Sequence, residues 1–203
     1  SHQGQSVITT IDKFVQQQVQ TIINRHVEQL SSNEINNAAA IVIDVKTNTI
    51  LAYAGNAINS WEHNNAVDII KARRSTGSLL KPFLYGSMLT SGELLPQMLI
   101  PDIPTFIAGY SPKNYYLSYD GAVKANEALY RSLNVPFVRL LRQHGVERFY
   151  STLKKMNMSS LVFDSGHYGL SLILGGAEGK LIEMSSMYAS IARVLMSFNN
   201  TFD

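Results

Sequence analysis

The spacing of hydrophobic residues near the beginning of the chain is typical of an amphipathic helix. From residue 11 to residue 30, apolar side chains recur every three or four positions with polar side chains between them. Thr10 precedes this run and is expected to act as its N-cap, and Ser31-Ser32-Asn33 ends it. We expect residues 1–10 to be a lead-in segment and residues 11–203 to belong to one domain. The apolar positions of the helix are Ile11, Phe14, Val15, Val19, Ile22, Ile23, Val27 and Leu30.

Two short apolar runs follow and predict a β-hairpin over residues 38–55. The runs 38–45 and 49–54 are rich in β-branched and small apolar residues, and the polar stretch Lys46-Thr47-Asn48 separates them. The first run is apolar almost throughout, so we expect its strand to be buried on both faces. The hairpin predicts an antiparallel sheet covered by helices.

A helix is predicted over residues 78–91. Its beginning is set by Pro82, because a proline ring in a helix clashes with the carbonyl group four residues earlier, which here belongs to Ser78. Ser78 would then lie in the first turn, where unpaired N–H groups and the helix dipole favour negative charge.

A long connecting segment and then several short helices follow. Residues 96–121 are rich in proline and tyrosine, and a segment of this length often lines a binding cleft. Helical spacing returns at 125–133, 135–143 and 146–156, which predicts a helical subdomain within residues 122–160. A last helix is expected over residues 181–196.

Composition and charge exclude several classes of protein. The chain has 203 residues, no cysteine and a net charge of +2, so disulfides and thiolate chemistry are excluded and nucleic-acid binding is not indicated. No apolar run is long enough to span a membrane. The five histidines are scattered without metal-ligand spacing, so no metal site is expected.

The candidate chemistry lies at Ser78 and Lys81. Residues three positions apart on a helix share a face, and a partly desolvated lysine can take the proton of a serine hydroxyl and activate it as a nucleophile. The same Ser-x-x-Lys spacing occurs at Ser151 and Lys154, but no glycine precedes that serine and no proline follows that lysine. We interpret the second pair as facing solvent.

Two other motifs are incomplete. The stretch 175–180, Gly-Gly-Ala-Glu-Gly-Lys, resembles a phosphate-binding loop, but Leu174 and Leu181 occupy the positions of its first glycine and its final serine or threonine. Gly-x-Ser-x-Gly is absent, so the nucleophile turn of an α/β-hydrolase is not indicated.

Longer stretches around Ser78 resemble the transpeptidase (penicillin-binding) domain of class A penicillin-binding proteins. Val67-Asp68 followed by residues 74–85, Arg-Ser-Thr-Gly-Ser-Leu-Leu-Lys-Pro-Phe-Leu-Tyr, is similar to the active-serine segment of that family. Residues 127–136, Glu-Ala-Leu-Tyr-Arg-Ser-Leu-Asn-Val-Pro, are similar to its second motif, Ser-x-Asn, in a helical setting.

The resemblance extends in consistent order from residue 6 to about residue 197. It is closest to the penicillin-binding protein 1C branch of the bifunctional class A enzymes. The other stretches that carry it are Thr9-Thr10-Ile11-Asp12, residues 38–55, Asp102-x-Pro104, Tyr110-x-Pro112-x-Asn114 and residues 168–178.

The resemblance implies an α/β (α+β) fold of the serine-transpeptidase and β-lactamase type, with an antiparallel sheet flanked by helices and a helical subdomain. It implies a peptidoglycan D,D-transpeptidase that cross-links stem peptides by acyl transfer from D-Ala-D-Ala through an acyl-serine intermediate and that β-lactam antibiotics block. Ser78 would be the nucleophile, Lys81 the general base and Ser132 a proton relay, while Asn134 and Gly77 would bind substrate. No cofactor, metal or nucleic acid is implied.

The third motif of the family, Lys-Thr/Ser-Gly, is missing, and its nearest match is Lys46-Thr47-Asn48 in the hairpin turn. We therefore expect this chain to be the N-terminal part of the domain, to lack the C-terminal strands of the sheet and to be inactive alone. The edge of its hairpin should be uncovered or paired with another chain.

The family also implies a location and leaves alternatives. The full-length protein would lie on the periplasmic face of the bacterial inner membrane, tethered by an anchor outside this chain. A serine β-lactamase and a non-catalytic penicillin-sensing domain of the same fold remain open as other functions.

Overall fold

The computed structural model describes residues 6–58, 63–64, 66–107 and 109–199. Its chain divides into two compact units, Ser1–Arg73 with Lys180–Asp203, and Arg74–Gly179. The assignment of residues 11–203 to one domain after a lead-in segment stays a prediction. Residues 1–5 of the expected lead-in lie outside the described residues.

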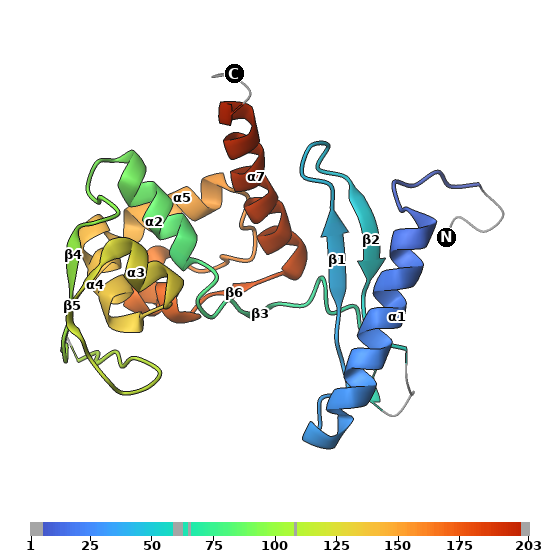
Figure 1. Ribbon diagram of the computed structural model, residues 1–203, viewed down its shortest axis with the longest axis horizontal. Coiled ribbons are helices and arrows are strands. Elements are labelled where there is room, and N and C mark those ends of the chain that lie inside the picture. The colour runs from blue at the N-terminus through green and yellow to red at the C-terminus, as the bar shows by residue number, and fades with distance from the viewer. Residues whose placement is uncertain (1–5, 59–62, 65, 108, 200–203) are drawn as a thin grey trace. The chain divides into compact units, whose positions relative to one another are not determined.

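The first unit combines a long helix, a hairpin and the last helix of the chain. Helix α1 packs against β2, and α7 packs against β1 (Figure 1). The bounds of its elements are α1 Lys13–Leu30, η1 Ser31–Asn33, β1 Ala40–Ile43, β2 Ile50–Ala54 and α7 Leu181–Asn199.

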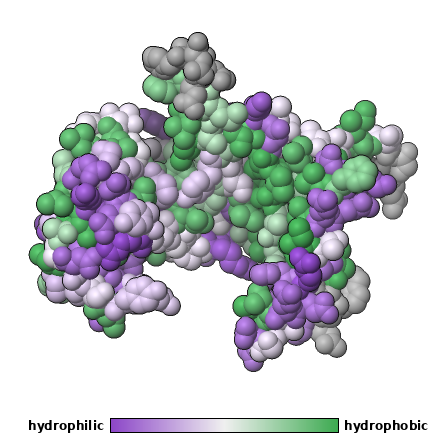
Figure 2. Space-filling view, viewed as in Figure 1, coloured by the Kyte–Doolittle hydropathy of each residue, from purple (hydrophilic) through white to green (hydrophobic). Residues whose placement is uncertain are grey.

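The hairpin predicted from the apolar runs is confirmed. Strands β1 and β2 pair antiparallel, with Ala40 opposite Ala54 and Val42 opposite Ala52. All four residues of β1 are half-buried, so the expectation that both of its faces are buried was wrong. Among the described residues β1 has a strand neighbour on one side only, and Figure 2 shows hydrophobic surface over this hairpin.

Residues before and within α1 cover the outer edge of β2. The Thr10 hydroxyl and the Asp12 N–H donate to carbonyl oxygens of β2 at 2.7 and 2.9 Å. The Gln16 side chain accepts from Tyr53 N at 2.7 Å and donates to Tyr53 O at 3.2 Å. One glutamine amide thus replaces the hydrogen bonds of a neighbouring strand at this edge.

The cap of α1 differs from the predicted one. Asp12 rather than Thr10 is the N-cap, and its carboxylate accepts from the N–H groups of Phe14 and Val15 at 2.9 and 3.0 Å. Thr10 is too far from the helix start at Lys13 to cap it.

The second unit is mainly helical and centres on α4. Helix α4 packs against α2, α3, α5, η3 and β4, and Phe137, Leu140 and Leu141 on it are buried. Strands β4 and β5 pair antiparallel, with Ile100 opposite Val123. The bounds of the elements are β3 Arg74–Ser75, α2 Lys81–Thr90, β4 Leu99–Asp102, β5 Gly121–Lys124, α3 Ala125–Tyr130, α4 Asn134–His144, α5 Val146–Lys155, α6 Ser165–Tyr168, η3 Gly169–Leu174 and β6 Glu178–Gly179.

Two boundaries in this unit differ from the sequence prediction. Helix α3 ends at Tyr130 instead of continuing to Leu133, and Asn134 begins α4 instead of breaking a helix. Residues 131–133 therefore form a loop that exposes Ser132. The proline- and tyrosine-rich segment 96–121 contributes β4 and the first residue of β5.

Candidate active site

Ser78 lies in a tight turn immediately before α2. Helix α2 begins at Lys81, so the predicted helix start at Ser78 was wrong by three residues. The reason is Pro82, which has no N–H to donate to the carbonyl of Ser78. That carbonyl instead accepts from Lys81 N at 3.1 Å.

A short strand pair and a hydroxyl anchor this turn within the second unit. Strand β3 pairs antiparallel with β6. Thr76 then donates twice to the carbonyl of Ala177, from N at 3.1 Å and from Oγ1 at 3.0 Å. Ser75 Oγ donates to the carbonyl of Gly175 at 2.8 Å. The chain immediately before Gly77 is therefore tied to residues about one hundred positions later.

Glycine at position 175 is required by this close approach. Its φ is +94°, and a Cβ placed there would lie 2.4 Å from Ser75 Oγ and 2.8 Å from Gly77 N. Gly77 also has a positive φ, +52°, a region that residues with a Cβ rarely adopt. Gly175, which belongs to the stretch that resembles a phosphate loop, therefore allows the close packing that holds the turn containing Ser78.

Lys81 is buried and faces the second motif. Its side chain points into the unit, and the residue is 1% exposed. Nζ donates to Ser132 O at 2.7 Å, to Ser132 Oγ at 3.2 Å and to Asn134 Oδ1 at 2.8 Å. The ring of Phe137 lies 5.6 Å from Nζ. Burial lowers the pKa of Lys81 to about 8.

Ser132 adopts a strained backbone conformation. Its φ is +55°, in the left-handed region that costs a residue with a Cβ about 1–2 kcal/mol. This conformation turns both the carbonyl and the hydroxyl of Ser132 toward Lys81. Strain of this kind persists where the surrounding structure enforces it, often at functional sites.

The structure brings three of the five predicted site residues into direct contact. Lys81, Ser132 and Asn134 form one hydrogen-bonded cluster, and Gly77 and Ser78 lie in the turn that leads to Lys81. Ser78 is exposed, and no hydrogen bond joins its Oγ to Lys81 Nζ in the part of the chain that the structure describes. The cluster can therefore supply a base, while the nucleophile candidate faces solvent beside it.

The second Ser-x-x-Lys pair has a different environment. Lys154 is exposed and donates to the carbonyl of Leu161 at 3.2 Å, while Ser151 is half-buried. The expectation that the pair faces solvent holds for the lysine only.

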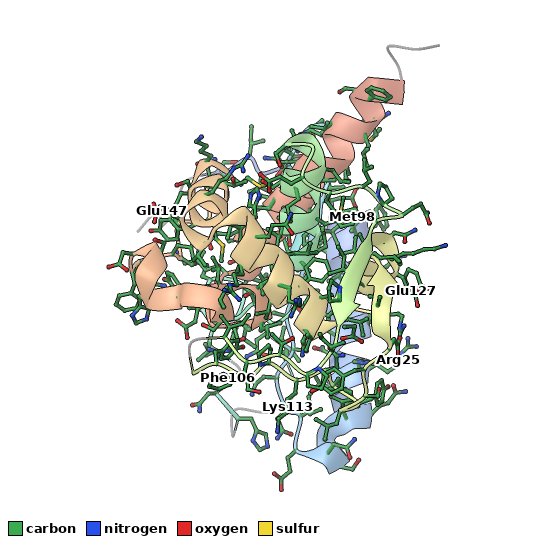
Figure 3. All side chains as sticks on the ribbon, turned by 90° about the vertical axis from the view of Figure 1, so that its left-hand side faces the viewer. Arg25, Met98, Phe106, Lys113, Glu127 and Glu147 are labelled. Carbon is green, nitrogen blue, oxygen red and sulfur yellow. The ribbon has the colours of Figure 1, made fainter. Side chains whose placement is uncertain are left out.

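The sequence did not identify the groups that orient Asn134. Asn134 Nδ2 donates to Lys113 O at 3.0 Å, and Asn134 N donates to Asn114 Oδ1 at 3.0 Å. Both partners belong to the loop between β4 and β5, and Figure 3 shows Lys113 on this loop. The only signal in the sequence was the resemblance of the stretch that ends at Asn114.

A pocket of 290 Å³ lies beside Ser132. A larger pocket of 430 Å³ lies between β4 and α4 and includes none of the predicted site residues. Within the described residues, no three histidine, aspartate or glutamate side chains are placed to hold a metal ion. The residues that line the smaller pocket are Asn114, Tyr115, Tyr116, Ser118, Arg131, Ser132 and Leu133.

Comparison with known proteins finds similar sequences. The family model described as penicillin binding protein transpeptidase domain matches residues 38–194. The chain is 32% identical to penicillin-binding protein 1C of Escherichia coli over 188 residues, which cover 92% of this chain and 24% of that protein. It is 28% identical over 196 residues to penicillin-binding protein 1B of Vibrio cholerae, covering 93% of this chain and 25% of that protein. The chain thus spans about a quarter of the length of these curated relatives.

Solved structures show the same fold. The penicillin-binding protein PonA1 from Mycobacterium tuberculosis has a TM-score of 0.75 at 23% identity, covering 93% of this chain and 50% of that one. PonA1 in complex with penicillin V has a TM-score of 0.68, also at 23% identity, over 92% of this chain and 51% of that one. Among the described residues, no helix has both the length and the apolar character needed to cross a membrane.

Proposed function

The chain belongs to the family of penicillin-binding protein transpeptidase domains, and we propose that it carries the acyl-transfer residues of a peptidoglycan D,D-transpeptidase. The observation that carries this proposal is the buried Lys81, whose Nζ contacts both residues of the Ser-x-Asn motif. A buried, hydrogen-bonded lysine next to the turn that contains Ser78 is suited to proton transfer, unlike a lysine on the protein surface.

In the proposed reaction, Ser78 Oγ attacks the carbonyl carbon of the penultimate D-alanine of a stem peptide. The hydroxyl proton passes to the neutral amine of Lys81, the new Oγ–C bond forms, and the C–N bond to the terminal D-alanine breaks. The departing amine takes up the proton from Lys81 through Ser132, which returns the lysine to its neutral form. An amine of a second stem peptide then attacks the acyl-serine and loses a proton, the new C–N bond forms the cross-link, the Oγ–C bond breaks, and Ser78 Oγ takes up a proton.

The contacts of Lys81 support its assignment as the base. A pKa of about 8 leaves a useful fraction of neutral amine near neutral pH, whereas an exposed lysine is almost entirely protonated. Ser132 Oγ, 3.2 Å from Nζ, is within reach for proton relay. The tight turn at Gly77 leaves the Ser78 N–H as one proposed donor to the oxyanion of the tetrahedral intermediate.

Asn134 is proposed to bind the substrate backbone. Its Oδ1 accepts from Lys81, and one hydrogen of its Nδ2 is donated to Lys113 O. The amide nitrogen carries two hydrogens, so one remains for a substrate carbonyl. Asn134 would then link the base and the substrate.

We further propose that β-lactams acylate Ser78 and that the site faces the periplasm. The PonA1 complex with penicillin V belongs to the same fold and supports the first of these proposals. The peptidoglycan substrate supports the second, since stem peptides are cross-linked outside the cytoplasm. An anchor to the inner membrane would lie outside this chain.

The test uses the whole protein and a stem peptide that ends in D-Ala-D-Ala. We expect release of D-alanine together with a cross-linked product, both abolished by Ser78→Ala and both retained by the matched control Ser151→Ala. Acylation followed by slow hydrolysis without a cross-linked product would contradict the transpeptidase proposal and favour a sensor, and rapid β-lactam hydrolysis would favour a β-lactamase.

A further inference from the structure

Two buried polar residues, Asp102 at the end of β4 and Asn114 in the loop that follows it, lie outside the transpeptidase motifs. Asp102 and Asn114 are 1% and 4% exposed, although carboxylates and amides usually lie at protein surfaces. Both are fully engaged. Asn114 Nδ2 donates to Asp102 Oδ1 at 2.7 Å and to Ser118 O at 3.0 Å, and Asp102 Oδ2 accepts from Asp120 N at 3.0 Å.

Asn114 caps helix α4 from outside the helix. The N-cap position, Leu133, has no side chain that can accept a hydrogen bond, and the first turn of α4 contains no acidic residue. Asn114 Oδ1 instead accepts from Asn134 N at 3.0 Å and from Val135 N at 3.1 Å. These are two of the N–H groups that every helix leaves without a partner at its beginning.

The same loop fixes which end of the Asn134 amide faces Lys81. The carbonyl of Lys113 can only accept, so it holds Nδ2 of Asn134, at 3.0 Å. Oδ1 is therefore turned toward Lys81 Nζ, 2.8 Å away. Rotation of the amide by half a turn would instead place its NH₂ group against the ammonium.

Asp102 fixes the orientation of Asn114 by the same logic. The carboxylate of Asp102 can only accept hydrogen bonds. Its Oδ2 accepts from Asp120 N, and its Oδ1 accepts from Nδ2 of Asn114. Asn114 Oδ1 must then face the beginning of α4. Each group thus donates to the next one: Lys81 donates to Asn134, Asn134 N donates to Asn114, and Asn114 donates to Asp102.

We propose that Asp102 and Asn114 are positioning residues of the acyl-transfer site, which hold the beginning of α4 so that the carboxamide oxygen of Asn134 faces Lys81. This inference rests on the proposed function and deepens it, because it assigns a role to a loop outside the three motifs. Small displacements of a positioning group can lower a rate by as much as about 10²-fold.

The test exchanges the two residues in the whole protein. In Asn114→Asp a second carboxylate faces Asp102 across the 2.7 Å contact, and we expect the second-order rate of acylation by a fluorescent penicillin to fall by about tenfold or more. In the double variant Asp102→Asn/Asn114→Asp, the amide at 102 donates to the carboxylate at 114, whose other oxygen caps α4. The carboxylate at 114 cannot donate to the Ser118 carbonyl as Asn114 does, so we expect this exchange to recover part, not all, of the rate that Asn114→Asp loses.

A pH profile separates positioning from a general loosening of the loop. The Asn134 oxygen stabilises the ammonium of Lys81, so displacing it in Asn114→Ala should move the midpoint of the pH dependence of acylation below about 8. The matched control is Thr105→Val, which removes the hydrogen bond from Arg139 to the same loop but touches neither Asn134 nor Asn114. This control should keep both the rate and the midpoint.

The proposal would be overturned if Asn114→Ala kept the original acylation rate and the original midpoint of its pH dependence. It would also be overturned if the double variant folded but was acylated as slowly as Asn114→Asp. If Asn114→Ala does not fold, Asp102→Asn carries the test, because it changes one atom and sets a donor against a donor. A normal rate in folded Asp102→Asn would also count against the proposal. Ser78→Ala, measured in parallel, distinguishes the two failures: if it reacts normally the proposed function is wrong, and if it is inert while the loop variants react normally only the positioning role is wrong.

Discussion

The buried position of Lys81 predicts how acylation depends on pH. Burial shifts the pKa of this lysine from 10.5 to about 8. At pH 7 the fraction of neutral amine rises from about 0.03% to about 9%, a gain of roughly 300-fold. If the neutral amine is the base that activates Ser78, the acylation rate should rise about tenfold per pH unit below the midpoint and level off above it.

The assay is the second-order rate of reaction of a fluorescent penicillin with the whole protein between about pH 6 and pH 9.5, corrected for spontaneous hydrolysis of the probe. Lys81→Arg supplies the perturbation, because a guanidinium group stays protonated throughout this range. We expect this variant to lose the pH dependence and to react about 10²–10⁴-fold more slowly. The matched control, Lys154→Arg, changes the exposed lysine of the second Ser-x-x-Lys pair and should keep the original profile.

Two results would refute this reasoning. One is a midpoint near 10.5, which would mean that burial does not lower the pKa of Lys81 in the working site. The other is a profile that Lys81→Arg leaves unchanged, which would mean that another group takes the proton of Ser78.

Three further predictions concern stability, each measured by denaturant or thermal unfolding. The pKa of Lys81 is lower in the folded state than in the unfolded state, so the unfolded state binds more protons between about pH 8 and pH 10.5. The free energy of unfolding should therefore rise by about 3 kcal/mol across this window, and Lys81→Met should abolish the rise. Equal pH dependence in both proteins would contradict this. Ser132→Gly should be about 1 kcal/mol more stable than Ser132→Ala, because glycine tolerates the φ of +55°, and equal stabilities would argue against strain there. Gly175→Ala should destabilise by more than about 2 kcal/mol, because its Cβ would lie 2.8 Å from Gly77 N. The control Gly86→Ala, in a helix with open space around its Cβ position, should be neutral or slightly stabilising, and similar losses at both sites would contradict the packing argument.

The sequence predicted those parts of the fold that depend on local patterns. The helical spacing from Ile11 to Leu30 and the two β-branched runs of the hairpin were sufficient because both patterns are local and can be recognised within a few neighbouring residues. The predicted helix boundaries were less accurate where one backbone N–H group determines the first residue of the helix. Pro82 predicted that the helix could hardly start before Ser78, but its missing N–H moves the start to Lys81.

Features that depend on contacts between distant residues were not predictable in this way. The pairing of β4 with β5 and the cap that Asn114 provides to α4 join segments about 20 residues apart through a proline-rich loop. Likewise, Gly175 is needed for its approach to Gly77, and nothing near it in the sequence shows that requirement. The residues of the two motifs were identified by resemblance, and the burial of Lys81, which gives the site its chemistry, became visible only in the structure.

The central claim is that Ser78 is the nucleophile of an acyl-transfer site. The most direct measurement is peptide mass mapping of the whole protein after reaction with a β-lactam. We predict one added acyl group on the peptide that contains Ser78, absent from Ser78→Ala and strongly reduced in Lys81→Arg, with the peptide that contains Ser151 unmodified. An adduct on another residue, or the same adduct in Ser78→Ala, would contradict the account.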